Sequence, residues 1–188
     1  MQQLLEADKY LFRLINSTWH HPIMDEMLPL FRIKYYWLPL YLFLALFILI
    51  NFKKNGWLWI LFAAGTAALT DFVSSSIIKE NFMRLRPCND PDMASNIRVL
   101  VSYRPISSSF TSSHAANHFG TATFIFFTLR KQIGHWAWAF FAWAFIIIYA
   151  QVYVGVHYPI DVLCGAMVGF LFGYLSAKSF NKNYSLAQ

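Results

Sequence analysis

Residues 155–177, which read GVHYPIDVLCGAMVGFLFGYLSA, decide the fold. After the acid Asp161, this stretch contains only uncharged and mostly apolar residues. A bilayer core about 30 Å thick is crossed by roughly 20 apolar helical residues. We therefore predict that a helix spans a membrane from Tyr158 to Ala177, with His157 and Asp161 near its first turn.

Three glycines recur every fourth residue within this span, namely Gly165, Gly169 and Gly173. With 3.6 residues per turn, they lie on one face of the helix. Small residues at this spacing let two membrane helices approach each other closely. This face is predicted to pack against another helix.

The composition of the whole chain agrees with a membrane protein. Of its 188 residues, 57% are hydrophobic and 13% are charged, whereas soluble domains carry about 25% charged residues. With 7 Trp, 10 Tyr and 19 Phe, the chain is also unlike a disordered one. The 15 Lys and Arg residues stand between apolar runs, so nucleic acid is not the expected partner. Cys88 and Cys164 form no CxxC pair, which disfavours a disulfide framework.

We expect an all-α integral membrane bundle, a single domain over residues 1–188, with about five transmembrane helices. The predicted spans are Tyr35–Phe52, Gly56–Ile78, Ser113–Leu129, His135–Val156 and Tyr158–Ala177. No signal-peptide pattern precedes the first span, which is therefore expected to act as the targeting signal.

The N-terminal residues 1–17 are amphipathic and too polar to span a membrane. Four charged residues, Glu6, Asp8, Lys9 and Arg13, are expected to lie off an apolar stripe. The stripe consists of residues that recur at helical spacing, namely Leu4, Ala7, Leu11, Leu14 and Ile15. The pattern predicts a helix that lies in the membrane interface.

The connections between spans predict an orientation. The short links at residues 51–55 and 129–134 and the C-terminal tail contain lysine or arginine and no acid. Basic residues in short loops favour the cytoplasmic side. This places the N-terminus and the long loop 79–112 outside, in a bacterial-type inner (cytoplasmic) membrane crossed several times.

Three polar clusters stand at the outer ends of the spans. In the first, Lys79 is followed after six residues by Arg86 and Pro87. Two cations one to two helical turns apart at a membrane surface suit an anion with several oxygens. The alternative is snorkelling of two long basic side chains at the interface.

The second cluster, SSSFTSSH, covers residues 107–114 and opens the third span. Thr111 or Ser112 is a natural N-cap, and the free N–H groups that follow form an anion site. His114 then stands in the first helical turn, beside that site. Simple helix capping is the alternative interpretation of the serines.

The third cluster is His157 and Asp161, which are separated by four residues and share a helix face. A carboxylate at membrane depth needs a partner. A hydrogen bond from one ring nitrogen of His157 to Asp161 would leave the other nitrogen unprotonated and nucleophilic. A purely structural His–Asp pair is the alternative.

Together the clusters resemble the signature of the type 2 phosphatidic acid phosphatase superfamily, whose phosphate site is shared with vanadium haloperoxidases. That signature reads K-x6-R-P, P-S-G-H and S-R-x5-H-x3-D. The first part is complete here, and Ser112, His114, His157 and Asp161 match in the others.

The resemblance implies a role for each matching residue. His157 would be the nucleophile that becomes phosphohistidine, and Asp161 would orient it. His114 would protonate the leaving oxygen and then activate water. The non-bridging oxygens of the phosphate would be held by Lys79, Arg86, Ser112, and N–H groups near Ser113.

This sequence departs from the signature at four positions. Thr111 and Ser113 replace its proline and glycine, and Ala150 and Gln151 replace its serine and arginine. Gln151 can donate hydrogen bonds to phosphate, but it lacks the charge and the fork of arginine. We expect one of the remaining arginines, Arg84, Arg98 or Arg104, to fold over the site as a replacement cation, and first Arg104.

No metal or other cofactor is expected, because the sequence lacks the acidic cluster that magnesium needs. His114 and His118, four residues apart, could clamp zinc, but no acidic or thiol partner stands near them in the sequence.

The predicted function is therefore metal-independent hydrolysis of a lipid phosphate or pyrophosphate, with undecaprenyl pyrophosphate or a lipid A phosphate as leading substrates. The alternatives are a lipid phosphotransferase and a non-catalytic lipid-phosphate binding protein. The expected partner is the membrane lipid itself, and no protein partner is implied.

Overall fold

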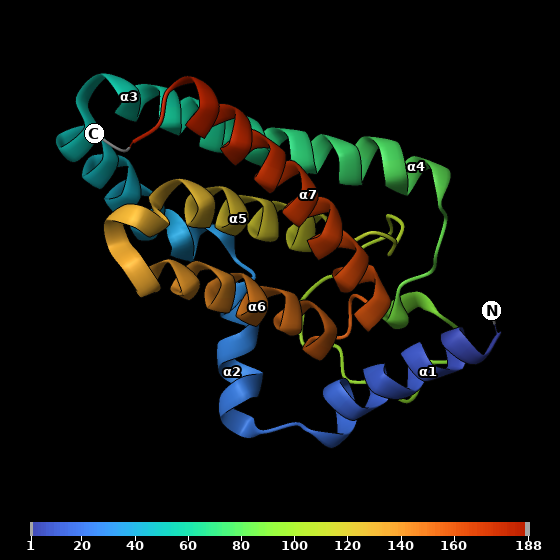
Figure 1. Ribbon diagram of the computed structural model, residues 1–188. Helices are drawn as coiled ribbons and strands as arrows, with labels where there is room; N and C mark the ends of the chain where they lie inside the picture. The colour runs from blue at the N-terminus through green and yellow to red at the C-terminus, as the bar shows by residue number, and fades with distance from the viewer. Residues whose placement is uncertain (1, 187–188) are drawn as a thin grey trace.

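The computed structural model describes residues 2–186, and these contain helices and no strand. The all-α prediction is thus confirmed (Figure 1). In chain order the helical elements are α1 (Gln2–Arg13), η1 (Leu14–Thr18), α2 (Pro22–Phe31), η2 (Lys34–Trp37), α3 (Leu38–Phe72), η3 (Val73–Ile78), α4 (Lys79–Asn81), η4 (Pro87–Asn89), α5 (Ser113–Ile133), η5 (Gly134–Ala137), α6 (Trp138–Tyr153) and α7 (Pro159–Asn183).

Four helical stretches in the described residues are long and apolar enough to cross a membrane, and the chain is a multi-pass membrane protein. They are Lys34–Lys53, Asn55–Asn81, Ser113–Tyr153 and Pro159–Asn183. The long α3 is bent at Lys53, where φ is 42°, so its two halves belong to different stretches. The third stretch contains both α5 and α6, which lie side by side in Figure 1. The five predicted spans correspond to these segments.

The helices run a few residues beyond several of the predicted span ends. Beyond Leu129, the end of the third predicted span, α5 continues to Ile133 and includes Arg130 and Lys131 in its last turn. The reversal comes at Gly134, whose φ of 59° suits a residue without Cβ. Lys79 was expected to begin the long loop, but the helix continues through it as α4.

The glycine face of α7 packs directly on α5, as predicted. A Cβ atom at Gly169 would lie 2.3 Å from the Ala116 carbonyl oxygen, and one at Gly173 would lie 2.4 Å from that of Gly120. A Cβ at Gly165 would meet the Ser112 carbonyl oxygen at 2.5 Å. The two helices that carry the second and third polar clusters are therefore held in backbone contact.

The N-terminal helix α1 lies across the end of the bundle at which α7 begins (Figure 1). Phe12 is fully buried and packs edge-on against Tyr158, with ring centroids 5.4 Å apart. Asp8 was expected to lie off the apolar stripe, but it is buried on the same inner face as Phe12. Leu4 and Leu11 of the predicted stripe are exposed instead. Burial of this helix in the membrane interface stays a prediction.

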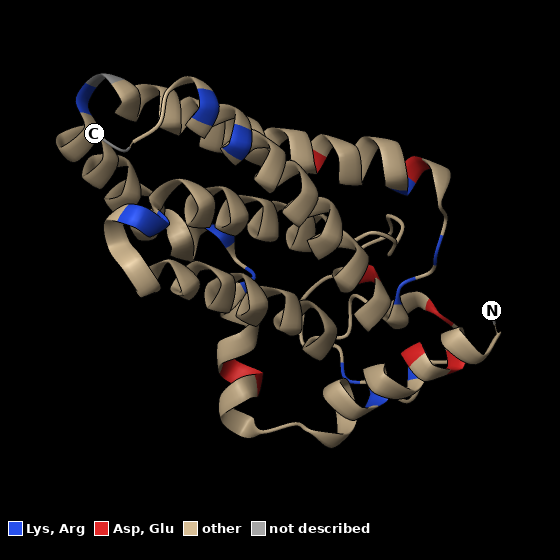
Figure 2. Cartoon of the chain, viewed as in Figure 1, with Lys and Arg blue, Asp and Glu red and all other residues tan. Residues whose placement is uncertain are grey.

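The charged residues are distributed unevenly between the two ends of the bundle. Figure 2 shows Lys and Arg at both ends, whereas the acids lie on α1, α2, the start of α7, the long loop and the part of the bundle that leads into it. Basic residues and no acid are found in the connections at 51–55 and 129–134 and in the C-terminal residues from Lys178 onward. Which end faces the cytoplasm stays a prediction.

Candidate active site

His157 lies two residues before the start of α7 and is 2% exposed. Pro159 opens the helix at its first turn, where its missing N–H costs nothing. The Nε2 atom of His157 is 3.0 Å from Nη1 of Arg86. A guanidinium can only donate, so Nε2 is the acceptor and carries the lone pair.

The protonation of His157 follows from its surroundings. Burial lowers the pKa of His157 to about 4, and the cations of Arg86 and Lys79 act in the same direction. The carboxylate of Asp161 opposes them. The imidazole is therefore neutral near pH 7, with a lone pair on Nε2, as a nucleophile requires.

Asp161 is fully buried and its two oxygens have separate partners. Oδ1 accepts from Nη1 of Arg84 at 2.5 Å. Oδ2 accepts from the Ser109 hydroxyl at 2.6 Å and from the N–H of Tyr158 at 2.9 Å. The carboxylate therefore also caps the start of α7, since Tyr158 precedes its first residue.

The expected direct hydrogen bond between His157 and Asp161 is absent. Nδ1 of His157 is 3.8 Å from Oδ2 of Asp161, which is an ion-pair distance and too long for a hydrogen bond. The Ser109 hydroxyl lies 3.4 Å from Nδ1 and donates to Asp161. Ser109 was not selected from the sequence, although it belongs to the serine run that was.

Arg86 joins the long loop to His157. Its guanidinium donates to the carbonyl oxygens of Ser107, Val156 and Ser108 at 2.9, 3.1 and 3.3 Å, and to the Ser107 hydroxyl at 3.1 Å. Only 5% of the residue is exposed, and this burial lowers the pKa of Arg86. Lys79 is half-buried on α4.

The start of α5 is organised as predicted for an N-cap. The Ser112 hydroxyl accepts from the N–H of Ala115 at 3.3 Å, so Ser112 is the cap. Its own N–H donates to the backbone oxygen of Asp161 at 3.1 Å, which ties α5 to α7 at the site. The hydroxyl of Ser113 is 2.8 Å from that of Ser75.

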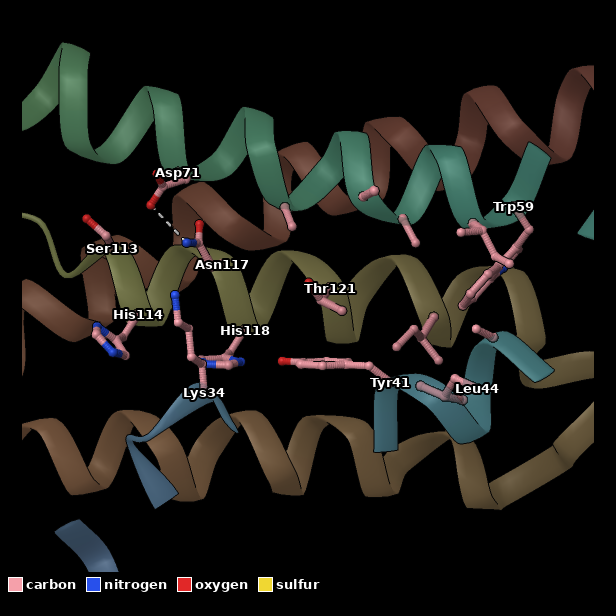
Figure 3. A pocket seen from close by; sticks show the side chains of 16 residues that line it. Lys34, Tyr41, Leu44, Trp59, Asp71, Ser113, His114, Asn117, His118 and Thr121 are labelled. Carbon is pink, nitrogen blue, oxygen red and sulfur yellow. Dashed lines mark hydrogen bonds between the residues drawn. The ribbon is translucent and has the colours of Figure 1, made fainter. Parts of the chain in front are cut away.

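His114 lines a cavity of about 680 Å³ between α3, η2 and α5 (Figure 3). One end of this cavity is polar, with Lys34, Asp71, Asn117 and His118 near His114. The other end is apolar and is lined by Leu44, Trp59, Ile60 and Ile125, among others. The cavity thus offers polar side chains at one end and apolar side chains at the other, as an amphipathic molecule requires.

His118 packs edge-on against Trp143, with ring centroids 4.9 Å apart, and its ring centroid is 6.3 Å from that of His114. Within residues 2–186, no three His, Cys, Asp or Glu side chains are gathered as metal ligands.

Gln151 is contacted by an arginine other than Arg84, Arg98 and Arg104, the expected replacement cations. Gln151 is fully buried, and its Oε1 accepts from Nε of Arg32 at 3.1 Å. Arg84 is engaged by Asp8 and Asp161. Arg104 is exposed and donates to the Cys88 carbonyl oxygen at 3.0 Å. Arg32, at the end of α2, was not selected, because no sequence signal links it to position 151.

The site's geometry can be set beside known proteins. The sequence model of the PAP2 superfamily matches residues 56–185, which include all three polar clusters. The chain belongs to the PAP2 superfamily.

Individual PAP2 relatives match most of the chain. The lipid A 4'-phosphatase of Bacteroides thetaiotaomicron is 32% identical over 92% of this chain and 76% of its own length. The undecaprenyl-diphosphatase of Sulfolobus acidocaldarius is 28% identical over 89% of this chain and 76% of its own. The crystal structure of Aquifex aeolicus LpxE superposes with a TM-score of 0.63 at 30% identity, covering 90% of this chain and 93% of that one.

The predicted family and enzyme class are thereby confirmed. The protein is a PAP2 phosphatase of the membrane, and its substrates are lipid phosphates.

Proposed function

We propose that this PAP2 protein hydrolyses a lipid phosphate or pyrophosphate at the outer face of the inner membrane, through a phosphohistidine at His157. The observation that carries the proposal is the 3.0 Å contact between Nε2 of His157 and Nη1 of Arg86. It directs the lone pair of a neutral imidazole toward a cation that would hold a phosphate oxygen.

The first chemical step is attack of Nε2 on phosphorus. The N–P bond forms while the bond from phosphorus to the leaving oxygen breaks. This is the ester oxygen of a lipid phosphate or the bridging oxygen of a lipid pyrophosphate, and the imidazolium of His114 gives a proton to it. Arg86, Lys79 and the N–H groups at the start of α5 stabilise the negative charge on the non-bridging oxygens.

In the second step, His114 takes a proton from water, whose oxygen attacks phosphorus. The N–P bond breaks, inorganic phosphate leaves, and His157 is again neutral. Asp161 stabilises the positive charge that His157 carries in the intermediate. Because the histidine and carboxylate are 3.8 Å apart, the Ser109 hydroxyl mediates part of this effect.

The cavity beside His114 supports a lipid substrate. Its apolar end accommodates part of an acyl or prenyl chain, while the phosphate stays near the polar end. Similarity to a lipid A 4'-phosphatase favours a lipid A phosphate, and the match to an undecaprenyl-diphosphatase makes a prenyl pyrophosphate the second candidate.

A substrate panel tests this proposal. Purified protein in detergent with chelator would be given lipid A, undecaprenyl pyrophosphate, phosphatidic acid and phosphatidylglycerol phosphate, with His157→Ala alongside. Release of phosphate from one lipid, lost in the variant, is expected. Transfer to an added acceptor alcohol without release would indicate a phosphotransferase instead. Binding of a lipid without either product would indicate a binding protein.

The orientation is tested separately with reporter fusions. Fusions after Asn55 and Gln188 are expected to report the cytoplasm, because each fusion point lies in a segment that has basic residues and no acid. A periplasmic reading at both would place the site on the inner face.

A further inference from the structure

Position 151 is where the family signature has an arginine, and here a glutamine occupies it. Gln151 is 0% exposed, so both ends of its amide need partners. Oε1 accepts from Nε of Arg32 at 3.1 Å. Nε2 has no hydrogen-bond partner among the described residues. A buried, unpartnered amide donor is suited to an acceptor that enters the site from outside.

Arg32 reaches this glutamine from a distant part of the chain. It directly follows α2 and is 119 residues away from Gln151 in the sequence. The side chain is partly buried. Desolvation lowers the pKa of Arg32, and its interaction with the Tyr103 side chain acts in the opposite direction. No carboxylate within residues 2–186 lies at ion-pair distance from it.

A partly buried cation without a carboxylate partner is suited to an anion that enters the site. Arg32 lies close enough to Arg86 that its charge contributes to lowering the pKa of Arg86. Arg86 in turn contacts the nucleophile His157. The hydrogen bond to Gln151 uses Nε of Arg32 and fixes the orientation of its two Nη groups. These form the planar fork that binds two phosphate oxygens.

We propose that Arg32 supplies the phosphate-binding cation that the family signature places at position 151, and that Gln151 positions it. The inference rests on the proposed phosphatase function. The cation is thus supplied by Arg32 at the end of α2 and not by a residue of α6, and Gln151 of α6 is its hydrogen-bond partner. Gln151 contributes its unpartnered Nε2 as a further donor to the same phosphate.

The test uses full-length protein in detergent and two readouts. One is hydrolysis of lipid A, and the other is binding of orthovanadate, measured as the rise in Tm that it produces. Vanadate adopts the five-coordinate geometry of phosphoryl transfer, so its binding reports the phosphate cradle without turnover. The variants are Arg32→Gln, Gln151→Arg, the double variant of both, and Arg104→Gln as the matched control on the exposed arginine.

We expect Arg32→Gln to lower kcat/KM about 100-fold, as loss of one charged donor to a transition state does, and to weaken vanadate binding. Arg104→Gln should stay within about twofold of wild type. The double variant should recover at least about tenfold over Arg32→Gln, because it restores the arginine at its place in the signature. Because the double variant also restores an Arg–Gln pair, vanadate separates the two roles. A phosphate contact predicts that Arg32→Gln keeps its Tm without vanadate and loses the rise that vanadate produces, whereas a structural role predicts a lower Tm without vanadate.

Equal effects of Arg32→Gln and Arg104→Gln would overturn the proposal. A double variant that folds but shows no recovery of kcat/KM would also overturn the proposal. This outcome can be read even where Arg32→Gln alone does not fold. If wild type releases no phosphate but binds vanadate through Arg32, the hydrolase assignment fails and the Arg32 site stands. If wild type neither hydrolyses lipid nor binds vanadate, both fail.

Discussion

Arg84 donates to Oδ1 of Asp161 at 2.5 Å, and its second Nη group donates to Asp8 at 2.6 Å. One guanidinium thus ties the carboxylate beside His157 to the N-terminal helix α1. These two ion pairs raise the pKa of Arg84, and its guanidinium also stacks on the ring of Tyr158, 4.2 Å from its centroid. The N-terminal helix is therefore part of the framework that orients Asp161.

Replacement of Asp8 tests this connection. Asp8 is 5% exposed, and its Oδ1 accepts from the N–H of Ile160 in the first turn of α7. Asp8→Ala leaves that N–H and one side of Arg84 without a partner, which costs about 1–3 kcal/mol for each buried group. We expect a lower Tm and a roughly tenfold lower kcat with KM less affected. Asp92→Asn, at an exposed ion pair with Lys9, is the control and should change neither. Wild-type kcat in Asp8→Ala would exclude a positioning role.

Ser109 is expected to matter for the chemical step. Ser109→Ala removes the hydroxyl between Nδ1 of His157 and Oδ2 of Asp161, leaving a 3.8 Å gap. The imidazole then loses orientation and a route to the stabilising carboxylate, so kcat should fall about 10- to 100-fold. Ser102→Ala, an exposed serine in the same loop, serves as the control. An unchanged kcat would mean that Asp161 acts on His157 without Ser109.

Glycine replacement tests the contact between α5 and α7. Gly169→Ala would place a Cβ 2.3 Å from the Ala116 carbonyl oxygen, so the helices must move apart. We expect a loss of about 1–3 kcal/mol in stability and lower activity, because His114 and Asp161 are carried by these two helices. Gly65→Ala is the control, since a Cβ there meets nothing within 4 Å. Equal Tm values for the two variants would contradict the close packing.

The pH dependence of stability follows from the lowered pKa of His157. The value falls from 6.5 in the unfolded chain to about 4 in the folded one. Between these values the unfolded chain binds more protons, so stability is complete above about pH 6.5 and declines as the pH falls toward 4. Each unit of difference corresponds to about 1.4 kcal/mol.

Thermal unfolding in detergent from pH 7.5 to 4.5 measures this effect. His157→Gln should flatten the decline, because it removes the group that must gain a proton on unfolding. The same slope in wild type and variant would show that His157 is not held neutral.

The local parts of the site could be predicted from the sequence. The cap at Ser112, the start of α7 at Pro159 and the glycine face depend on neighbouring residues and on helical spacing, which a single sequence displays. The first-turn positions of His114 and Asp161 follow from those helix starts. The length of the apolar runs also predicted the spans. The helices run past the predicted ends where basic residues such as Lys79 and Arg130 remain helical.

The missing parts all depend on contacts between distant segments. Asp8 appeared to belong to the polar side of an amphipathic helix, and only the packing of α1 on α7 shows that it is buried. Arg32 could not be distinguished from Arg84 or Arg104, because what separates them is the fold of α2 against α6. The insertion of Ser109 between His157 and Asp161 likewise depends on the path of the long loop.

The most direct test of the account is to trap the covalent intermediate. Protein given lipid A labelled with ³²P at its phosphates would be quenched in base within milliseconds, and the labelled peptide identified by mass spectrometry. The account predicts a base-stable, acid-labile phosphate on His157, formed with chelator present and absent from His157→Ala. Turnover without any label on His157, or label that persists in His157→Ala, would contradict it.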